Sequence, residues 1–144
     1  MPDDSSQIHA PPETILFVED EALIRMDMAE FLRGCGYRVH EAANAEEARE
    51  ALQSKFAIDL VFADINLPGG MNGLELVDWI LSNRPGVKVL VTTGRALDRD
   101  VPPIAGALLA KPYTGRDLLD RVNHALAKPA DGGESTSGAG EAES

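Results

Sequence analysis

The chain of 144 residues is poor in cysteine, in aromatic residues and in positive charge. Its single cysteine, Cys35, excludes an internal disulfide framework and fits a reducing compartment. Because Cys35 falls late in an amphipathic segment, we expect it to be buried as a small apolar side chain. The 13 Lys and Arg residues against 24 Asp and Glu residues give a net charge of -11, which disfavours non-specific binding to nucleic acid or to anionic membranes.

Long hydrophobic runs are also absent, and none approaches the roughly 20 residues that a membrane-spanning helix needs. The polar residues 1–12 have neither the basic n-region nor the apolar h-region of a signal peptide. We therefore expect a cytoplasmic protein that contacts no membrane. The glycine-rich phosphate loop of nucleotide-binding proteins is missing as well, because the turn after the first apolar run reads Glu19-Asp20-Glu21-Ala22.

The length suits one domain of about 100–150 residues with short extensions. We expect a flexible leader over residues 1–12 and a folded domain over residues 13–128. Residues 129–144 contain no large apolar side chain, so that segment cannot offset the entropy cost of becoming ordered. It is predicted to be a disordered acidic tail.

Four short apolar runs each end in residues that can do chemistry. Ile15–Val18 is followed by Glu19-Asp20, Leu60–Ala63 by Asp64, Val89–Val91 by Thr92-Thr93, and Ala107–Ala110 by Lys111-Pro112. Segments with helical spacing separate most of these runs, and Tyr37–Glu41 alternates as an edge strand does. Apolar runs that alternate with helices predict a parallel sheet covered on both faces.

Start and stop signals bound the expected helices. Asn44 with Glu47 three residues later predicts a capping box, and Thr114 is expected to cap the last helix. Gly36 predicts the end of the helix that begins near Glu21. The segment between Arg95 and Ile104 contains Pro102-Pro103, which excludes a long helix, so we expect a short, irregular helix or a loop there.

Three acids, Glu19, Asp20 and Asp64, are predicted to meet at one edge of the sheet, where the carboxyl ends of parallel strands lie together. Two carboxylates about 4 Å apart repel by roughly 4 kcal/mol at an effective dielectric of about 20. Such a cluster must take up protons or hold a cation, and Mg2+ prefers oxygen ligands. The alternative, that Glu19 and Asp20 only cap the following helix, does not account for Asp64.

Lys111 and Thr93 complete the predicted set at the same sheet edge. In isolation, a surface lysine and a structural threonine are the commoner interpretations of such residues. An ammonium at this edge can pair with a carboxylate or contact a phosphoryl oxygen, and a hydroxyl can donate a hydrogen bond to one. An aspartate flanked by a metal ion and a lysine is a plausible nucleophile toward phosphorus.

Taken in this order, the motifs resemble the receiver domain of bacterial two-component response regulators. The resemblance runs from about Thr14 to Lys128. The matching segments are ILFVEDE over 15–21, LVFADINLP over 60–68, NGLE over 72–75, VLVTTG over 89–94 and KPY over 111–113. The resemblance implies an α/β, flavodoxin-like, doubly wound fold around a five-stranded parallel sheet with strand order 2-1-3-4-5.

The resemblance also implies a phosphoacceptor and a metal site. Asp64 would accept the phosphoryl group from a histidine kinase or a histidine phosphotransfer protein. Asp20 and Asp64 would bind Mg2+ directly, and Glu19 would act through a water molecule. The backbone carbonyl of Asn66 would complete the protein ligands.

Further roles, and two departures from the family pattern, follow from the same resemblance. Lys111 would contact the phosphoryl oxygens, Thr93 would move toward them, and Asn66 and Arg95 would tune the lifetime of the aspartyl phosphate. Leu108 stands where receivers usually carry Tyr or Phe, three residues before the lysine, so the usual coupling of hydroxyl and aromatic ring is not expected. The segment after Arg95 is also shorter than usual, and it belongs to the face that many receivers use to dimerise.

We interpret the chain as a stand-alone switch that acts by docking a downstream protein, as a monomer or as a phosphorylation-dependent dimer, without binding nucleic acid. A start at Met1 and an acidic end favour this interpretation over a receiver domain excised from a hybrid histidine kinase. A small Mg2+-dependent phosphatase with an aspartate nucleophile is an alternative of another class. That class normally has a second acid two residues after the nucleophile, where this chain has Asn66. We therefore expect no turnover enzyme.

Overall fold

The structure, a computed structural model, describes residues 12–54, 57–93 and 108–127. Five parallel strands form one sheet in the order β3-β2-β4-β5-β6, which is the predicted 2-1-3-4-5 order along the chain. Their bounds are β2 (Thr14–Val18), β3 (Arg38–Ala42), β4 (Leu60–Asp64), β5 (Lys88–Thr93) and β6 (Leu108–Ala110). The predicted fold class is confirmed.

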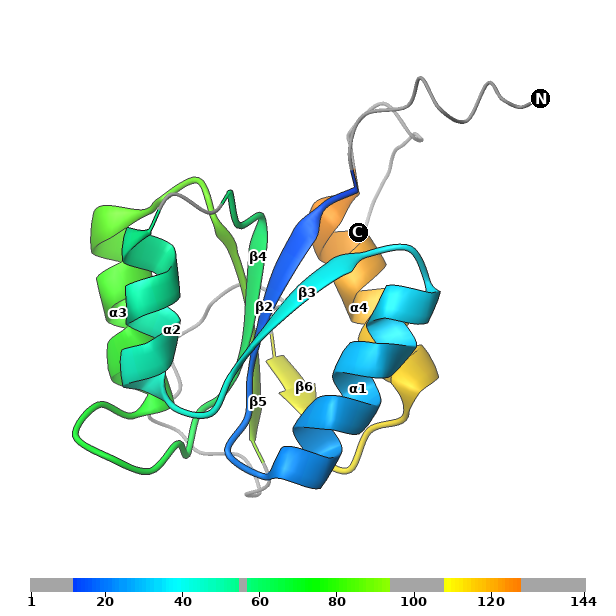
Figure 1. The fold of residues 1–144 in the computed structure, drawn as a ribbon, viewed down its shortest axis with the longest axis horizontal. Helices are drawn as coiled ribbons and strands as arrows, with labels where there is room; N and C mark the ends of the chain where they lie inside the picture. The colour runs from blue at the N-terminus through cyan, green and yellow to red at the C-terminus, as the bar shows by residue number, and fades with distance from the viewer. Residues whose placement is uncertain (1–11, 55–56, 94–107, 128–144) are drawn as a thin grey trace.

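Helices cover both faces of the sheet, as the pattern of apolar runs predicted (Figure 1). On one face lie α1 (Ala22–Gly34) and α4 (Gly115–Leu126), and on the other lie α2 (Ala45–Gln53) and α3 (Gly73–Asn83). Each layer encloses its own apolar core. The two central strands β2 and β4 contribute to both cores, and every one of their residues is buried.

The helix starts follow their capping residues. Thr114 and Asp117 form a reciprocal capping box, in which each side chain accepts the backbone N–H of the other residue at 3.0 Å. The predicted box at Asn44 is half formed, because Asn44 accepts the Glu47 N–H at 2.8 Å while the Glu47 side chain accepts from Ala43. The predicted stop is also present, since Gly36 has a φ of 104° after α1 ends.

The prediction for Cys35 was wrong. α1 ends at Gly34, so Cys35 lies outside the helix and its side chain is exposed. The last buried residue of this amphipathic segment is Leu32. The irregular segment expected between Arg95 and Ile104, the leader and the acidic tail lie outside the described residues, Pro12 excepted. Among the described helices, none is both long and apolar enough to cross a bilayer.

Candidate functional site

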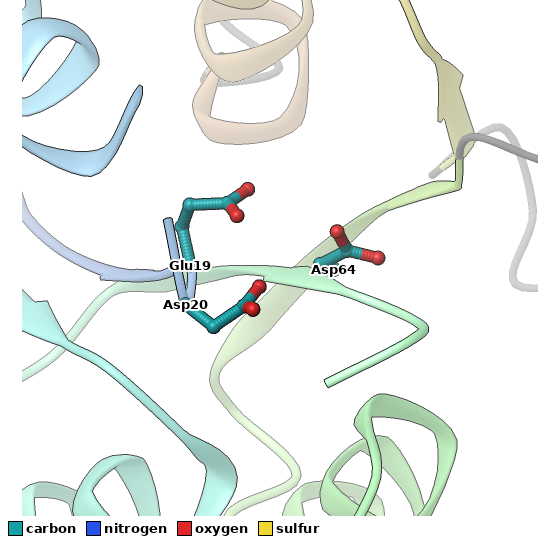
Figure 2. Close-up of side chains that lie close together, drawn as sticks. All are labelled: Glu19, Asp20 and Asp64. Carbon is teal, nitrogen blue, oxygen red and sulfur yellow. The ribbon is translucent and has the colours of Figure 1, made fainter. Parts of the chain in front are cut away.

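The three predicted acids lie together at the carboxyl edge of the sheet. Val18 of β2 pairs with Ala63 of β4, so the next residues, Glu19 and Asp64, stand side by side. Together with Asp20, they offer three carboxylate oxygens that all lie within 4.8 Å of one another. Figure 2 shows the Glu19 and Asp20 side chains extending from the end of β2 toward Asp64. Glu19 and Asp64 are 0% and 5% exposed, whereas Asp20 is exposed to solvent.

Lys111 reaches the same cluster from the end of β6. Its backbone N–H donates to the carbonyl of Thr93 at 3.0 Å, and the following Lys111–Pro112 peptide bond is cis. Its Nζ donates to Asp64 Oδ2 at 2.6 Å and lies 3.7 Å from Glu19 Oε1. Burial lowers the pKa of Lys111, but the hydrogen bond and the charge of Asp64, with the charges of Glu19 and Glu21, together outweigh burial, so the pKa is raised. Lys111 is therefore a cation paired chiefly with Asp64.

Asp64 is held by the backbone around it. Its Oδ1 accepts the N–H of Asn66 at 2.8 Å, and the Ile65 N–H donates to the carbonyl of Thr92 at 2.9 Å. The first residue of α3, Gly73, packs directly on this turn and donates its N–H to the Ile65 carbonyl at 3.0 Å. A Cβ at Gly73 would lie 2.1 Å from the Asp64 carbonyl oxygen, which leaves room only for glycine.

Burial and neighbouring groups act in opposite directions on the Glu19 carboxyl. Burial raises its pKa, which the N–H of Glu21 and the charge of Lys111 oppose, while the charge of Asp64 raises it further. The N–H of Glu21, the residue before α1, donates to Glu19 Oε2 at 3.1 Å, but α1 has no side-chain cap at its start and no acid in its first turn. The other oxygen, Oε1, is buried and accepts no hydrogen bond from the described residues.

This donor set fits a hard divalent cation. Three carboxylates face one ammonium, so negative charge remains in excess, and the buried Glu19 Oε1 lacks a hydrogen-bond partner in the described part of the chain. Mg2+ prefers oxygen ligands and usually keeps several waters, which one exposed and two buried carboxylates permit. Asn66 follows Asp64 by two residues on the same turn, so its backbone belongs to the same edge.

The remaining predicted residues differ in how closely they join the cluster. Thr93 is 3% exposed at the end of β5 and pairs with Ala110, the residue before Lys111. Its neighbour Thr92 pairs with Asp64 and has a buried hydroxyl without a hydrogen bond to any described residue. Leu108 is half-buried and packs against the core under α2 and α3. Arg95 lies outside the described residues.

Sequence reasoning missed three residues around the cluster, namely Arg25, Gly73 and Tyr113. Arg25 donates from Nη1 to the Glu19 carbonyl oxygen at 2.8 Å. Tyr113 packs edge-on against Phe62, with ring centroids 5.8 Å apart, and burial raises the pKa of its hydroxyl. Gly73 and Tyr113 stand in the NGLE and KPY segments that carry the family resemblance, and a glycine after a helix-capping Asn also suggests a close backbone approach.

Comparison with known proteins agrees with this geometry. The model of the response regulator receiver domain family matches residues 15–123. The transcriptional regulatory protein PdtaR of Mycobacterium tuberculosis is 38% identical over 125 residues, a match that covers 83% of this chain and 59% of that protein. The sensor kinase CckA of Brucella abortus is 34% identical over 120 residues, which cover 80% of this chain and 13% of that kinase.

Solved structures give the same result. A receiver domain protein of Methanospirillum hungatei is 32% identical with a TM-score of 0.71, and the match covers 78% of this chain and 92% of that one. The response regulator TrrA of Thermotoga maritima, solved in complex with Mg2+ and BeF, is 30% identical with a TM-score of 0.71 and is covered over 99% of its length, against 79% of this chain. The chain therefore belongs to the response regulator receiver domains of two-component systems, a family of phosphoryl-accepting signalling modules that bind Mg2+ in an acidic pocket.

Proposed function

We propose that this chain is a switch that is phosphorylated on Asp64. The observation that carries the proposal is the position of the Asp64 carboxylate, which accepts a hydrogen bond from Lys111 and has an oxygen within 4.8 Å of carboxylate oxygens of Glu19 and Asp20. A buried carboxylate placed between a fixed cation and a cation-binding acid pair is suited to attack phosphorus. The family membership of the chain supports the same role.

The transfer step is a substitution at phosphorus. An oxygen of Asp64 forms a new O–P bond while the P–N bond of a donor phosphohistidine breaks, and the electron pair of that bond returns to the imidazole. Lys111 exchanges its hydrogen bond to Asp64 for one to a phosphoryl oxygen, and the Thr93 hydroxyl turns toward another. When bound, Mg2+ would neutralise charge on the phosphoryl oxygens. Asp20, Asp64 and the Asn66 carbonyl would hold it, with Glu19 acting through water.

Partners follow from this chemistry. Receiver domains interact with histidine kinases or phosphotransfer proteins and with downstream targets, so a donor of one of these kinds and a protein target are proposed here. The chain spans 59% of PdtaR and 13% of CckA, and either a stand-alone regulator or a domain of a longer kinase fits the site. We favour the stand-alone form, a monomer or a phosphorylation-dependent dimer in the cytoplasm. Asn66 and Arg95 are the proposed modulators of phosphate lifetime.

Phosphorylation by acetyl phosphate or a cognate kinase in the presence of Mg2+ tests the proposal. Wild-type protein should take up one phosphoryl group, and Asp64→Asn should abolish uptake, because the amide has no nucleophilic carboxylate oxygen. Intact mass spectrometry and Phos-tag electrophoresis measure the labelled fraction. Asp78→Asn is the matched control, since Asp78 is exposed on α3, and it should label as wild type does. Stoichiometric labelling of Asp64→Asn would overturn the assignment.

A further inference from the structure

The backbone of Glu19 is fixed from two directions. Its N–H donates to the carbonyl oxygen of Ala42, the last residue of the edge strand β3, at 3.0 Å. Its own carbonyl oxygen accepts Arg25 Nη1 at 2.8 Å. A hydrogen bond from a guanidinium is stronger than one between neutral groups. Both backbone polar groups of Glu19, the residue that follows β2, are therefore hydrogen-bonded, one to a strand and one to a side chain of α1.

Arg25 is itself held in place. Its Nε donates to Glu41 Oε1 at 3.3 Å, and the two side chains are 18% and 26% exposed. The Arg25 backbone lies in the first turn of α1, where its N–H donates to the Glu21 carbonyl at 2.9 Å. The guanidinium therefore bridges Glu41 of β3 and the residue that follows β2, which ties the edge strand to the acid cluster.

The fixed backbone has a consequence for the Glu19 side chain. Oε2 is held by the Glu21 N–H at 3.1 Å, which leaves Oε1 on the side of Lys111, 3.7 Å from its Nζ. Oε1 is the buried oxygen that accepts no hydrogen bond from the described residues. A change in the Glu19 backbone torsions would move this oxygen from its place beside Lys111.

We propose that Arg25 is a positioning residue for the cation site. Its hydrogen bond to the Glu19 carbonyl oxygen fixes the Glu19 backbone and thereby the position of the buried carboxylate. The inference rests on the proposed Mg2+ site. A positioning role and a purely electrostatic role predict opposite changes in Mg2+ affinity when Arg25 is replaced. Arg25 is a cation near the cluster, so if it acted only through its charge, its removal would strengthen Mg2+ binding. If it positions Glu19, its removal weakens Mg2+ binding, as loss of an outer-shell partner does.

Titration of the full chain with MgCl2 distinguishes the positioning role from the charge-only role. Isothermal titration calorimetry and amide chemical shifts measure the binding. Arg25→Met keeps the apolar stem and removes the guanidinium, and Arg25→Lys keeps the charge without the fork that reaches two acceptors. Arg33→Met is the matched control. Arg33 lies on the same helix and bonds to the same Glu41, at 3.2 Å, but its carbonyl acceptor is that of Val39.

Arg25→Met should bind Mg2+ on the order of ten-fold more weakly than wild type, and Arg25→Lys should recover part of the loss, while Arg33→Met should match wild type. Unchanged or tighter binding by Arg25→Met overturns the inference and leaves the proposed function standing. If the Met variant fails to fold, the Lys variant decides, and wild-type affinity in it overturns the inference. Absence of Mg2+ binding by wild-type protein would overturn the inference and the proposed metal site together.

Discussion

The two sides of the acid cluster are held by different means. Asp64 sits on a strand buried on both faces, and its turn is packed under the backbone of Gly73, which admits no side chain. Glu19 follows a strand that is equally buried, but besides the hydrogen bond to Ala42 its backbone is held by a charged side chain, Arg25, that reaches back from α1. The backbone at Asp64 is therefore fixed by backbone packing, whereas the backbone at Glu19 also depends on a side-chain contact.

This difference has consequences for how each side tolerates change. Backbone packing leaves no room for adjustment, so a substitution at Gly73 acts on the whole fold. A side-chain contact can be weakened without loss of the fold, so substitutions on the Glu19 side act on the cation site first. Asp20, which follows Glu19 and is exposed, contributes charge with little packing.

The largest effect is expected from Gly73→Ala. The new Cβ would lie 2.1 Å from the Asp64 carbonyl oxygen, 2.7 Å from Ile65 Cα and 2.9 Å from the Asp64 carbonyl carbon. All three are backbone atoms of the sheet edge, so α3 or the turn must shift. We expect the free energy of unfolding to fall by about 3 kcal/mol, at the upper end of the usual cost of overpacking. Urea denaturation measures it.

Gly86→Ala is the control for that substitution. In the described part of the chain, no atom apart from Gly86 and its two neighbours in sequence lies within 4 Å of a Cβ built at Gly86, so its effect should stay within about 0.5 kcal/mol. If Gly73→Ala proved as mild as Gly86→Ala, the Asp64 side would be no more rigid than the Glu19 side, and the contrast would disappear.

A smaller effect is expected from Asp20→Ala, which removes an exposed carboxylate of the cluster. Mg2+ affinity should fall by at least about ten-fold, or about 1.4 kcal/mol, while the fold is retained because little packing is lost. Calorimetric titration with MgCl2 measures the affinity, and urea denaturation confirms the fold. Asp27→Ala, an exposed charge on the second turn of α1, should leave the affinity near that of wild type. Equal affinities in the two variants would argue against the metal site.

The positions of the residues at the strand ends could be predicted from the sequence, because the sheet topology determines at which edge they lie. Once the apolar runs indicated parallel strands, Glu19, Asp64 and Lys111 had to share one edge, whatever the details of packing. The same logic places Thr93 beside Lys111, since its register partner is Ala110. The family resemblance then supplied the order of the strands and the proposed roles.

Contacts that depend on side-chain reach were not readable. The position of Arg25 in the sequence does not show that its guanidinium donates a hydrogen bond to the Glu19 carbonyl oxygen. That contact depends on how α1 packs against β3. The prediction for Cys35 was wrong for a related reason. α1 ends one residue before Cys35, and this places the Cys35 side chain in solvent and not on the apolar face of the helix. Periodicity locates a helix better than it locates the last residue.

The smallest expected effect is on the pH dependence of the free energy of unfolding, through the Glu19 carboxyl. Burial raises the pKa of Glu19 above its ordinary value of 4.5, but the Glu21 N–H and Lys111 lower it, so the opposing contributions partly cancel. A carboxyl whose pKa is raised on folding gives stability below pH 4.5, and the metal-free protein loses that stability as the pH rises through the folded pKa. Glu19→Gln does not ionise and should escape this loss.

In EDTA, the free energy of unfolding of Glu19→Gln relative to wild type should therefore increase between pH 4 and pH 7, as urea denaturation at a series of pH values would show. Glu30→Gln removes the same charge from a side chain on α1 that is 78% exposed, and it controls for the change in net charge. A relative stability that stays flat or falls with pH would mean that the Glu19 carboxylate is already balanced without a metal ion. The side-chain contacts would then suffice to hold it ionised, and the Glu19 side would need no cation of its own.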